Sequence, residues 1–297
     1  MSQREFTTLA TGFTYTEAPR WRDGKLWISD FYTKCVYSID LDGTVTTIAE
    51  VPNQPSGLGW LPNDTLLVVS MKDKKVMKIK EDGSLEEYAD LSSIAKGYCN
   101  DMYVDDHGRC YVGNFGFDLM NGGDMDTACL IMIDIDGTLK VVADELYFPN
   151  GTVRTPDKRT LIINESFGNR VSAFAIQDDG TLGERKDWAV FGPLATGPNF
   201  GDYAQASVVA PDGACIDAEG AVWISDCLGQ QAVRVKDNKI VETIDLSPFN
   251  VGTFACELGG VDGKTLFLCV APDFEEHKRT QAREGEIWMT KVAVGAA

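Results

Sequence analysis

The chain has 297 residues and a formal net charge of −18, because 45 acidic side chains outnumber 27 basic ones. So acidic a surface argues against nucleic acid or an anionic membrane as a partner, since both carry negative charge themselves. The 44% hydrophobic content is enough to bury a large core, and one all-β barrel or propeller domain can span residues 1–297.

The N-terminal sequence, MSQREFTTLATGF, is polar, and no apolar run long enough for a membrane helix follows it. We therefore expect no signal peptide, no membrane span and a cytoplasmic location. The eight cysteines include no CxxC pair. This spacing favours buried, reduced thiols over disulfides or a zinc site.

Six similar units follow one another along the chain. Each has a short first strand, a turn, a mostly apolar second strand and a third strand, and the first five add a fourth strand. The second strands are the clearest, and they occupy residues 25–30, 65–70, 109–114, 160–165, 221–226 and 265–270. A repeat of roughly 40 to 60 residues built from short strands is typical of propeller blades. The sequence therefore predicts an all-β, six-bladed propeller of four-stranded blades.

The sixth unit lacks an outer strand, because the chain ends just after KVAVGAA. Residues 5–11, EFTTLAT, have the pattern of a strand that belongs to no unit. We predict that this N-terminal strand pairs with the C-terminal blade and closes the ring, since closure removes an exposed strand edge.

Two sets of polar residues recur at equivalent positions of the units. In an antiparallel blade the first strand begins where the second strand ends, so both sets are expected on one face, the first of them at the mouth of the central tunnel. The first set stands at the start of the first strand: Glu17, Ser56, Asn100, Asn150 and Asp212. The second set ends the second strand: Asp30, Ser70, Asn114, Glu165 and Asp226, with Val270 breaking the pattern.

Three long loops are expected to open on this same face, at residues 115–129, 190–210 and 271–286. Long loops in a compact domain are usually functional or disordered. Above a ring of carboxylates and amides, we interpret them as the walls of a binding pocket.

Histidine chemistry is poorly supported. Of the two histidines, His107 is expected in a turn on the opposite face and His277 in a loop. A Ser–His–Asp or Cys–His arrangement is therefore disfavoured, and no glycine-rich phosphate loop opens a helix.

A metal site built from oxygen ligands is the better interpretation. The carboxylates of Glu17 and Asp212, with the amide oxygens of Asn150 and Asn100, suit a divalent cation such as Ca²⁺, Mg²⁺ or Mn²⁺. The alternative is that each side chain only caps its own turn.

Five signatures spread along the chain resemble the gluconolactonase, regucalcin (senescence marker protein) and luciferin-regenerating-enzyme family of six-bladed propellers. They are TEAPRW (16–21), YCNDMYVDDHGR (98–109), FPNGTVRTPD (148–157), PDGACIDAEGAVWISD (211–226) and ACELGGVDGKTLF (255–267). The resemblance implies that Glu17, Asn150 and Asp212 bind one divalent cation (Ca²⁺, Mg²⁺, Mn²⁺ or Zn²⁺). Asn100 would contact the substrate or complete the metal shell.

The sequence departs from the sugar-lactone members of that family at two points. They carry an arginine where this chain has Tyr98, and a glutamate in the loop where Asp118 is the nearest match. With Phe115 and Phe117, Tyr98 makes this wall of the expected substrate site more aromatic. We therefore expect a lactone with fewer hydroxyl groups than gluconolactone, unless Arg279 or Arg283 replaces the missing arginine.

The function expected from these features is hydrolysis of a small-molecule lactone, with Asp212 accepting the proton of water, in a monomer or small homo-oligomer. Three alternatives stay open at this point. They are a non-catalytic Ca²⁺-dependent binding protein, another propeller hydrolase such as a phosphotriesterase, and a condensing enzyme resembling strictosidine synthase. The fold alone does not choose between them.

Overall fold

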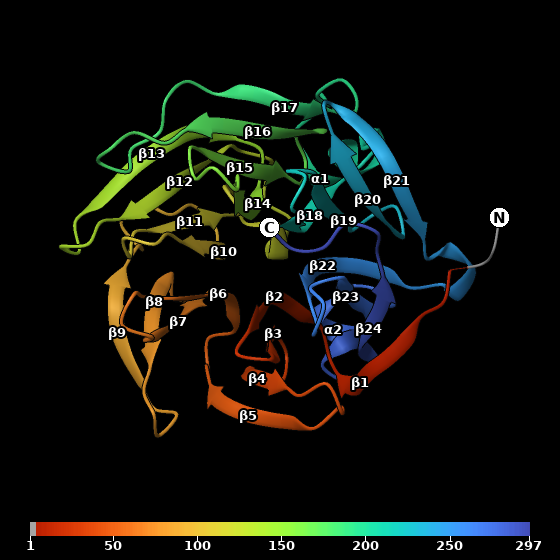
Figure 1. The fold of residues 1–297 in the computed structure, drawn as a ribbon. Coiled ribbons are helices and arrows are strands. Elements are labelled where there is room, and N and C mark those ends of the chain that lie inside the picture. The colour runs from red at the N-terminus through yellow and green to blue at the C-terminus, as the bar shows by residue number, and fades with distance from the viewer. Residues whose placement is uncertain (1–3) are drawn as a thin grey trace.

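The computed structural model describes residues 4–297 as six four-stranded antiparallel sheets arranged around a central axis (Figure 1). In the first five sheets the strands follow chain order from the innermost to the outermost. The all-β, six-bladed propeller predicted from the repeats is confirmed. We number the blades 1 to 6 along the chain.

The strands of the first three blades are short, as the repeats predicted. Blade 1 contains β2 (Thr16–Arg22), β3 (Lys25–Asp30), β4 (Cys35–Ile39) and β5 (Val45–Glu50). Blade 2 contains β6 (Pro55–Trp60), β7 (Leu66–Ser70), β8 (Lys75–Ile79) and β9 (Leu85–Asp90). Blade 3 contains β10 (Cys99–Val104), β11 (Cys110–Asn114), β12 (Ala128–Ile133) and β13 (Leu139–Leu146).

The remaining blades repeat this arrangement. Blade 4 contains β14 (Pro149–Arg154), β15 (Thr160–Glu165), β16 (Arg170–Ala175) and β17 (Lys186–Val190). Blade 5 contains β18 (Pro211–Ile216), β19 (Val222–Asp226), β20 (Gln231–Lys236) and β21 (Lys239–Asp245). Blade 6 contains β22 (Gly252–Gly259), β23 (Thr265–Ala271), β24 (Gly285–Lys291) and β1 (Thr7–Phe13).

The helices are short and lie in connections between strands. They are the 3₁₀ helices η1 (Leu119–Asn121) and η2 (Ser247–Phe249) and the α-helices α1 (Phe200–Ala206) and α2 (Glu276–Arg279). Within residues 4–297, none of these helices has the length and apolar character needed to cross a membrane.

Ring closure by the N-terminal strand is confirmed. Strand β1 pairs antiparallel with β24, with Thr7 opposite Met289 and Thr11 opposite Glu286. The strand starts two residues later than the predicted 5–11. The first and last segments of the chain therefore share one sheet, and β1 leads directly into β2 of blade 1, which closes the ring (Figure 1).

The inner strand of every blade departs from regular pairing near its N-terminal end. In blade 1 the register shifts between Glu17 and Arg20, and in blade 4 between Pro149 and Thr152. The other four blades have a shift at the equivalent point. A bulge of this kind re-aims the neighbouring side chains, and four of the shifted segments contain Glu17, Asn100, Asn150 and Asp212.

The inner strands of blades 4 and 5 approach very closely. A Cβ atom at Gly151 would lie 2.5 Å from the carbonyl oxygen of Asp212, closer than real Cβ atoms come. Only glycine therefore allows β14 and β18 to lie at this separation. As a result, Asn150, which precedes the glycine, comes alongside Asp212.

Apolar side chains fill the spaces between blades. Between blades 2 and 3, for example, Leu67 and Val69 pack against Met102 and Val112, and all four are fully buried. Burial on both faces of the sheet explains why second strands such as β7 and β19 are almost continuously apolar.

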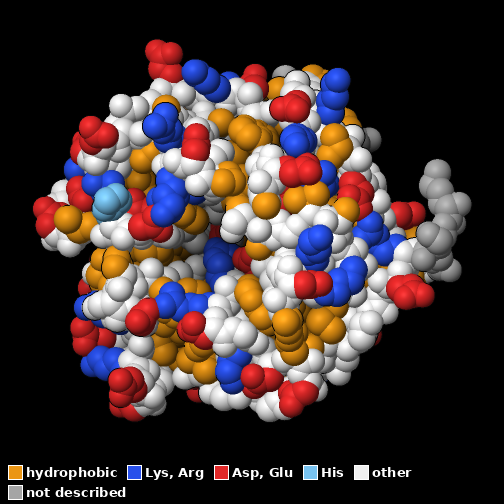
Figure 2. Space-filling model, viewed as in Figure 1, with side chains coloured by type: hydrophobic (Ala, Val, Ile, Leu, Met, Phe, Trp, Pro, Cys, Tyr) orange, Lys and Arg blue, Asp and Glu red, His pale blue; other side chains and the backbone are white. Residues whose placement is uncertain are grey.

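Figure 2 shows the face that carries the turns between first and second strands, where Ala296 bridges to Asp217 just after β18. Acidic and basic side chains are interspersed on it, and a hollow lies near its centre. The hollow is lined by Arg20, Arg22, Trp60 and Tyr103 among others. The starts of the inner strands, and with them the first polar set, lie at the opposite end of the tunnel.

Candidate functional site

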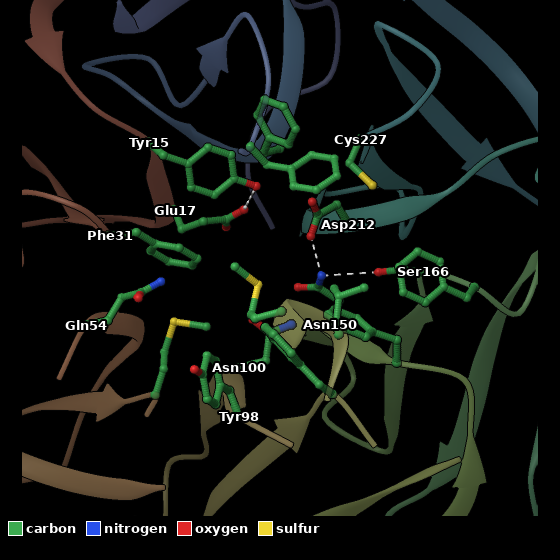
Figure 3. A pocket seen from close by; sticks show the side chains of 18 of the residues that line it. Tyr15, Glu17, Phe31, Gln54, Tyr98, Asn100, Asn150, Ser166, Asp212 and Cys227 are labelled. Carbon is green, nitrogen blue, oxygen red and sulfur yellow. Dashed lines mark hydrogen bonds between the residues drawn. The ribbon is translucent and has the colours of Figure 1, made fainter. Parts of the chain in front are cut away.

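Four members of the first polar set line one pocket at the mouth of the tunnel. Glu17, Asn100, Asn150 and Asp212 come from blades 1, 3, 4 and 5, and Figure 3 shows them around a common space. The fifth member, Ser56 of blade 2, is buried and does not line the pocket. The structure thus brings together all three residues expected to bind a metal.

Asn150 and Asp212 are in direct contact. The amide nitrogen of Asn150 donates to Oδ1 of Asp212 and, at 3.2 Å, to Oγ of Ser166. Ser166 in turn donates to the carbonyl oxygen of Pro211 at 2.9 Å. These bonds orient the amide of Asn150, and no donor within residues 4–297 bonds its Oδ1, which is left available for a ligand.

Glu17 is held by two weaker contacts. The hydroxyl of Tyr15 donates to Oε1 at 3.4 Å, and the backbone N–H of Ala18 donates to Oε2 at 3.1 Å. Ala18 has a φ of 49°, a left-handed conformation that is uncommon outside glycine. Strain of this kind is often found beside functional groups.

Neither Glu17 nor Asp212 forms an ion pair with a basic side chain among residues 4–297. Burial raises the pKa of Glu17, and nearby Asp101 adds to the rise. Burial and the charge of Glu17 hold the pKa of Asp212 well above its usual range. Two buried carboxylates whose pKa values are both raised form a site of negative potential, which a bound cation would relieve.

The donor set fits a divalent cation that prefers oxygen. Within residues 4–297, no three His, Cys, Asp or Glu side chains gather into a metal-binding cluster. A metal at Glu17 and Asp212 would therefore need amide oxygen as a further ligand, and Asn150 offers one. Hard cations such as Ca²⁺, Mg²⁺ and Mn²⁺ accept such a set, whereas Zn²⁺ more often takes nitrogen or sulfur.

Asn100 carries an unused hydrogen-bond donor. Its Nδ2 atom is buried and has no hydrogen-bond partner within residues 4–297. A buried donor without a partner is costly and rare in native proteins. Because Asn100 lines the pocket, this donor is free to bond a ligand.

The walls of the pocket repeat along the chain as regularly as its floor. Some wall residues lie two positions before a member of the first polar set. Others lie one position after a member of the second polar set. The former are Tyr15, Gln54, Tyr98 and Phe148, and the latter are Phe31, Met71, Phe115, Ser166 and Cys227. Within each of blades 1 to 5, the backbone N–H of the residue after the second polar set donates to the carbonyl oxygen of the residue two before the first polar set. Examples are Phe115 to Tyr98 at 2.9 Å and Cys227 to Ala210 at 3.1 Å.

This wall is the part of the site that our sequence interpretation largely missed. The signal was present, because the same alignment that located Glu17 and Asp212 also locates Tyr15 and Phe148 two residues before the polar positions. The cysteines are all free, as expected, and five are buried. Cys227 is the exception that matters, because its thiol lies beside Asp212 in the pocket (Figure 3).

The predicted substrate residues do not all reach the pocket. Tyr98 and Phe115 line it. Phe117 instead packs behind the wall, with its ring centroid 6.5 Å from that of Phe148. Asp118 lies outside the lining and accepts hydrogen bonds from Nδ2 of Asn121 at 3.0 Å.

The three long loops form walls as predicted. Each contributes an apolar side chain to the pocket, namely Leu119, Phe200 and Phe274. Neither Arg279 nor Arg283 lines it. Arg279 instead pairs with Glu284 at 2.7 Å and with Asp273 at 3.2 Å, so it does not replace the arginine that Tyr98 displaces.

A family model described as the SMP-30/gluconolactonase/LRE-like region matches residues 15–272. The chain belongs to this family. All members of the first polar set and the whole pocket floor fall inside the matched range.

Relatives of this SMP-30/gluconolactonase/LRE-like protein are distant. The chain is 24% identical to 6-deoxy-6-sulfogluconolactonase of Pseudomonas putida, over 85% of this chain and 81% of that protein. It is 23% identical to regucalcin of Xenopus laevis, over 96% of this chain and 87% of that protein. A calcium-binding protein, regucalcin from Agrobacterium tumefaciens, has the same fold, with a TM-score of 0.78, 16% identity and coverage of 99% and 96% of the two chains.

The tunnel of this SMP-30/gluconolactonase/LRE-like protein holds a second polar cluster that the sequence did not reveal. The guanidinium of Arg20 donates to Oδ1 of Asp101 at 2.7 Å and to the carbonyl oxygens of Leu58 and Met102 at 3.1 and 2.9 Å. These bonds tie together the inner strands of blades 1, 2 and 3. The charge of Arg20 is thereby satisfied by Asp101, and it forms no ion pair with Glu17.

Proposed function

We propose that this protein is a divalent-metal-dependent lactonase that opens a small lactone to its hydroxy acid. The observation that carries the proposal is the pair of buried carboxylates, Glu17 and Asp212, which meet with the amide of Asn150 and have no basic partner within residues 4–297. Such a pair is stable as two anions only with a cation between them.

Glu17, Asn150 and Asp212 would hold the cation, each through a side-chain oxygen. A divalent cation at this place supplies a Lewis acid that polarises the ester carbonyl and lowers the pKa of water. The all-oxygen donor set favours Ca²⁺, Mg²⁺ or Mn²⁺ over Zn²⁺.

Asp212 is the best-placed general base. One of its oxygens accepts from Asn150, and the other remains to accept a proton. In the proposed reaction the water oxygen forms a bond to the carbonyl carbon as its proton passes to Asp212, and the ring C–O bond then breaks. The leaving alkoxide takes the proton back from Asp212, which restores the carboxylate and yields the hydroxy acid.

Asn100 is placed to stabilise the negative charge that develops during the reaction. Its unpartnered Nδ2 can donate to the lactone oxygen on which negative charge develops. A donor that is already fixed in place stabilises such charge without reorganising first.

The relationship to a lactonase such as 6-deoxy-6-sulfogluconolactonase supports this reaction class. The relationship to regucalcins keeps a second candidate in view, which is Ca²⁺ binding without catalysis. Both functions would use the same three ligands, so the decisive difference is turnover.

The test is hydrolysis of a panel of lactones by protein stripped of metal and then reloaded with Ca²⁺, Mg²⁺, Mn²⁺ or Zn²⁺ in turn, followed as acid release. We expect turnover that chelation abolishes and that at least one cation restores. Metal binding without turnover of any lactone would instead support the binding protein.

The ligand assignment has its own control. Glu17→Gln should weaken metal binding in calorimetry by at least about tenfold, because a charged ligand is lost. Glu257→Gln is the matched control, since Glu257 is also a glutamate on an inner strand but does not line the pocket. Equal metal affinity in the two variants would contradict the assignment of Glu17.

A further inference from the structure

The pocket separates its polar and apolar groups sharply. The carboxylates and amides gather at the floor, around Glu17 and Asp212 (Figure 3). The sides are built mainly from aromatic rings such as Phe31, Tyr98 and Phe148. A ligand held here meets hydrogen-bonding groups at one end and apolar surface elsewhere.

This separation disfavours a polyhydroxylated lactone. Its hydroxyl groups point outward all round the ring, so most of them would face aromatic side chains and lose their bonds to water without replacement. Among the wall residues, Gln54, Ser166 and the tyrosines carry polar groups. Ser166 and Tyr15 already donate hydrogen bonds within the protein, so few partners remain for these hydroxyls.

The charge of the site also disfavours an anionic lactone. No Lys, Arg or His within residues 4–297 lines the pocket, while Glu17 and Asp212 do. Lys72 lies over the ring of Tyr98 at 6.0 Å from its centroid, but its ammonium pairs with Glu276 at 3.1 Å. A carboxylate, phosphate or sulfonate on the ligand would therefore find no basic partner.

The aromatic walls are fixed in place. Phe148 has a φ of 60°, a strained backbone conformation for a bulky residue, and the N–H of Ser166 bonds its carbonyl oxygen at 3.1 Å. Its ring stacks on that of Phe115 with centroids 4.4 Å apart, and on the other side of the pocket Tyr15 contacts Phe254 at 4.7 Å. Rings that are already ordered bind a flat apolar ligand at low entropic cost.

The space between the walls is narrow. The cavity measures about 90 Å³, less than the engineered cavity of roughly 150 Å³ that binds benzene. A bicyclic ligand would therefore be enclosed only in part, and the rest of it would extend out of the cavity.

We infer that the site takes a neutral lactone that is fused to an aromatic ring, with the ester at Glu17, Asn150 and Asp212 and the ring between the aromatic walls. The inference rests on the proposed lactonase function for its reaction, but the preference for such a ligand is a matter of binding and can be measured without turnover.

The first experiment uses lactams, which resemble lactones in shape but resist hydrolysis. Calorimetry on the metal-loaded protein compares a benzo-fused six-membered lactam, 3,4-dihydroquinolin-2-one, with unsubstituted δ-valerolactam and with D-glucono-δ-lactam. We expect the benzo-fused lactam to bind at least about tenfold more tightly than δ-valerolactam, because one more ring is buried against aromatic surface. The hydroxylated lactam should bind most weakly, and the reverse order would overturn the inference.

The second experiment tests the walls through turnover. Phe200→Ala and Phe274→Ala remove half-buried loop rings, so the fold should survive. Each should lower the ratio of kcat/KM for 3,4-dihydrocoumarin to that for δ-valerolactone about threefold or more. Dihydrocoumarin has the better leaving group, which raises its kcat/KM in every variant. Comparing the ratio between variants removes this contribution.

Phe249→Ala is the matched control. Phe249 is 42% exposed and contacts Phe6 and Trp288 away from the pocket, so the ratio should not change. An unchanged ratio in all three variants would overturn the inference while leaving a lactonase in place. Tight binding of the benzo-fused lactam with no hydrolysis of any lactone would support the ligand class and contradict the proposed reaction.

Discussion

Two sets of buried carboxylates lie at the same end of the propeller, and their surroundings differ. Asp30, Glu165 and Asp226, which end the second strands, are as buried as Glu17 and Asp212, which begin the inner strands. The difference lies in the groups that bond them. Burial of an acidic side chain therefore does not indicate function until its donors are known.

The second-strand carboxylates are satisfied by the protein itself. Asp226 accepts the backbone N–H groups of Ala210 and Gly229, each at 3.0 Å. Glu165 pairs with Arg170 at 2.8 Å and accepts the N–H of Tyr147 at 2.8 Å. They attach the segment entering each inner strand to the end of the second strand, and so they hold the pocket walls in register.

The inner carboxylates have far fewer donors. Asp212 accepts from the amide of Asn150, and Glu17 from Tyr15 and the N–H of Ala18, with no basic partner in the described residues 4–297. This contrast indicates that the second polar set is structural, whereas the first is a candidate metal-binding set. Each of the following experiments tests that difference.

The largest effect is expected for Asp212→Asn. Loss of both a ligand charge and the proton acceptor should lower kcat/KM for any accepted lactone about 1000-fold. The melting temperature of the metal-free protein should not fall, since a buried charge without a basic partner is removed. Activity assays and calorimetry on the same preparation measure both, and a variant retaining a tenth of wild-type activity would refute the role of Asp212.

Glu165→Gln should have the opposite profile. It leaves the guanidinium of Arg170 without its carboxylate, and the side chain of Arg170 is only 17% exposed. We expect the free energy of unfolding to fall by about 3 kcal/mol, as for other broken buried pairs. Urea denaturation measures this loss, while kcat/KM of the folded protein should stay within about threefold of wild type. A loss of metal binding with unchanged stability would show that Glu165, a member of the second polar set, contributes to the metal site.

The pH dependence of the metal-free protein should reveal Glu17. Its pKa is raised from 4.5 to about 8, mainly by burial. Between these values the folded protein keeps a proton that the unfolded chain has released, so stability is full below pH 4.5 and declines as pH rises toward 8.

Melting temperatures in chelator should therefore fall across this pH range, and the fall should be smaller in Glu17→Gln. Saturating metal should also reduce this fall in melting temperature, because the bound cation takes over the stabilising role of the proton on Glu17. Parallel curves for wild type and Glu17→Gln would show that Glu17 does not carry the effect.

The smallest effect is expected for Cys227→Ser. Cys227 lies beside Asp212, which raises the question of a cysteine nucleophile. Burial and the charge of Asp212 hold the pKa of this thiol well above its usual range, so the reactive thiolate is disfavoured. Serine stands at the equivalent position of blade 4, as Ser166. We expect kcat/KM within about threefold of wild type, and a loss as large as that for Asp212→Asn would point to covalent catalysis instead.

The sequence alone determined the fold and the positions of the candidate ligands. Turns and short apolar strands repeat with a nearly constant spacing, and that spacing is a local property that a single chain displays. Since each unit forms the same blade, equivalent positions end at the same face, and Glu17, Asn150 and Asp212 could be grouped before any coordinates. The residues Tyr15 and Phe148 lay in the same register and could have been found by the same argument.

Only the tertiary structure decided which of the buried carboxylates have hydrogen-bond and ion-pair partners within the protein. The partners of Asp226 and Glu165 include the backbone N–H groups of Ala210 and Tyr147, which lie in the linkers before the inner strands of the same blades. Every residue type except proline supplies a backbone N–H, so no sequence pattern marks these partners. The contact between Asn150 and Asp212 depends on two blades meeting at Gly151, a close approach set by packing around the whole ring. The same packing placed Asp118 outside the pocket and Cys227 inside it, because loop residues adopt positions that nearby strands, rather than their own sequence, determine.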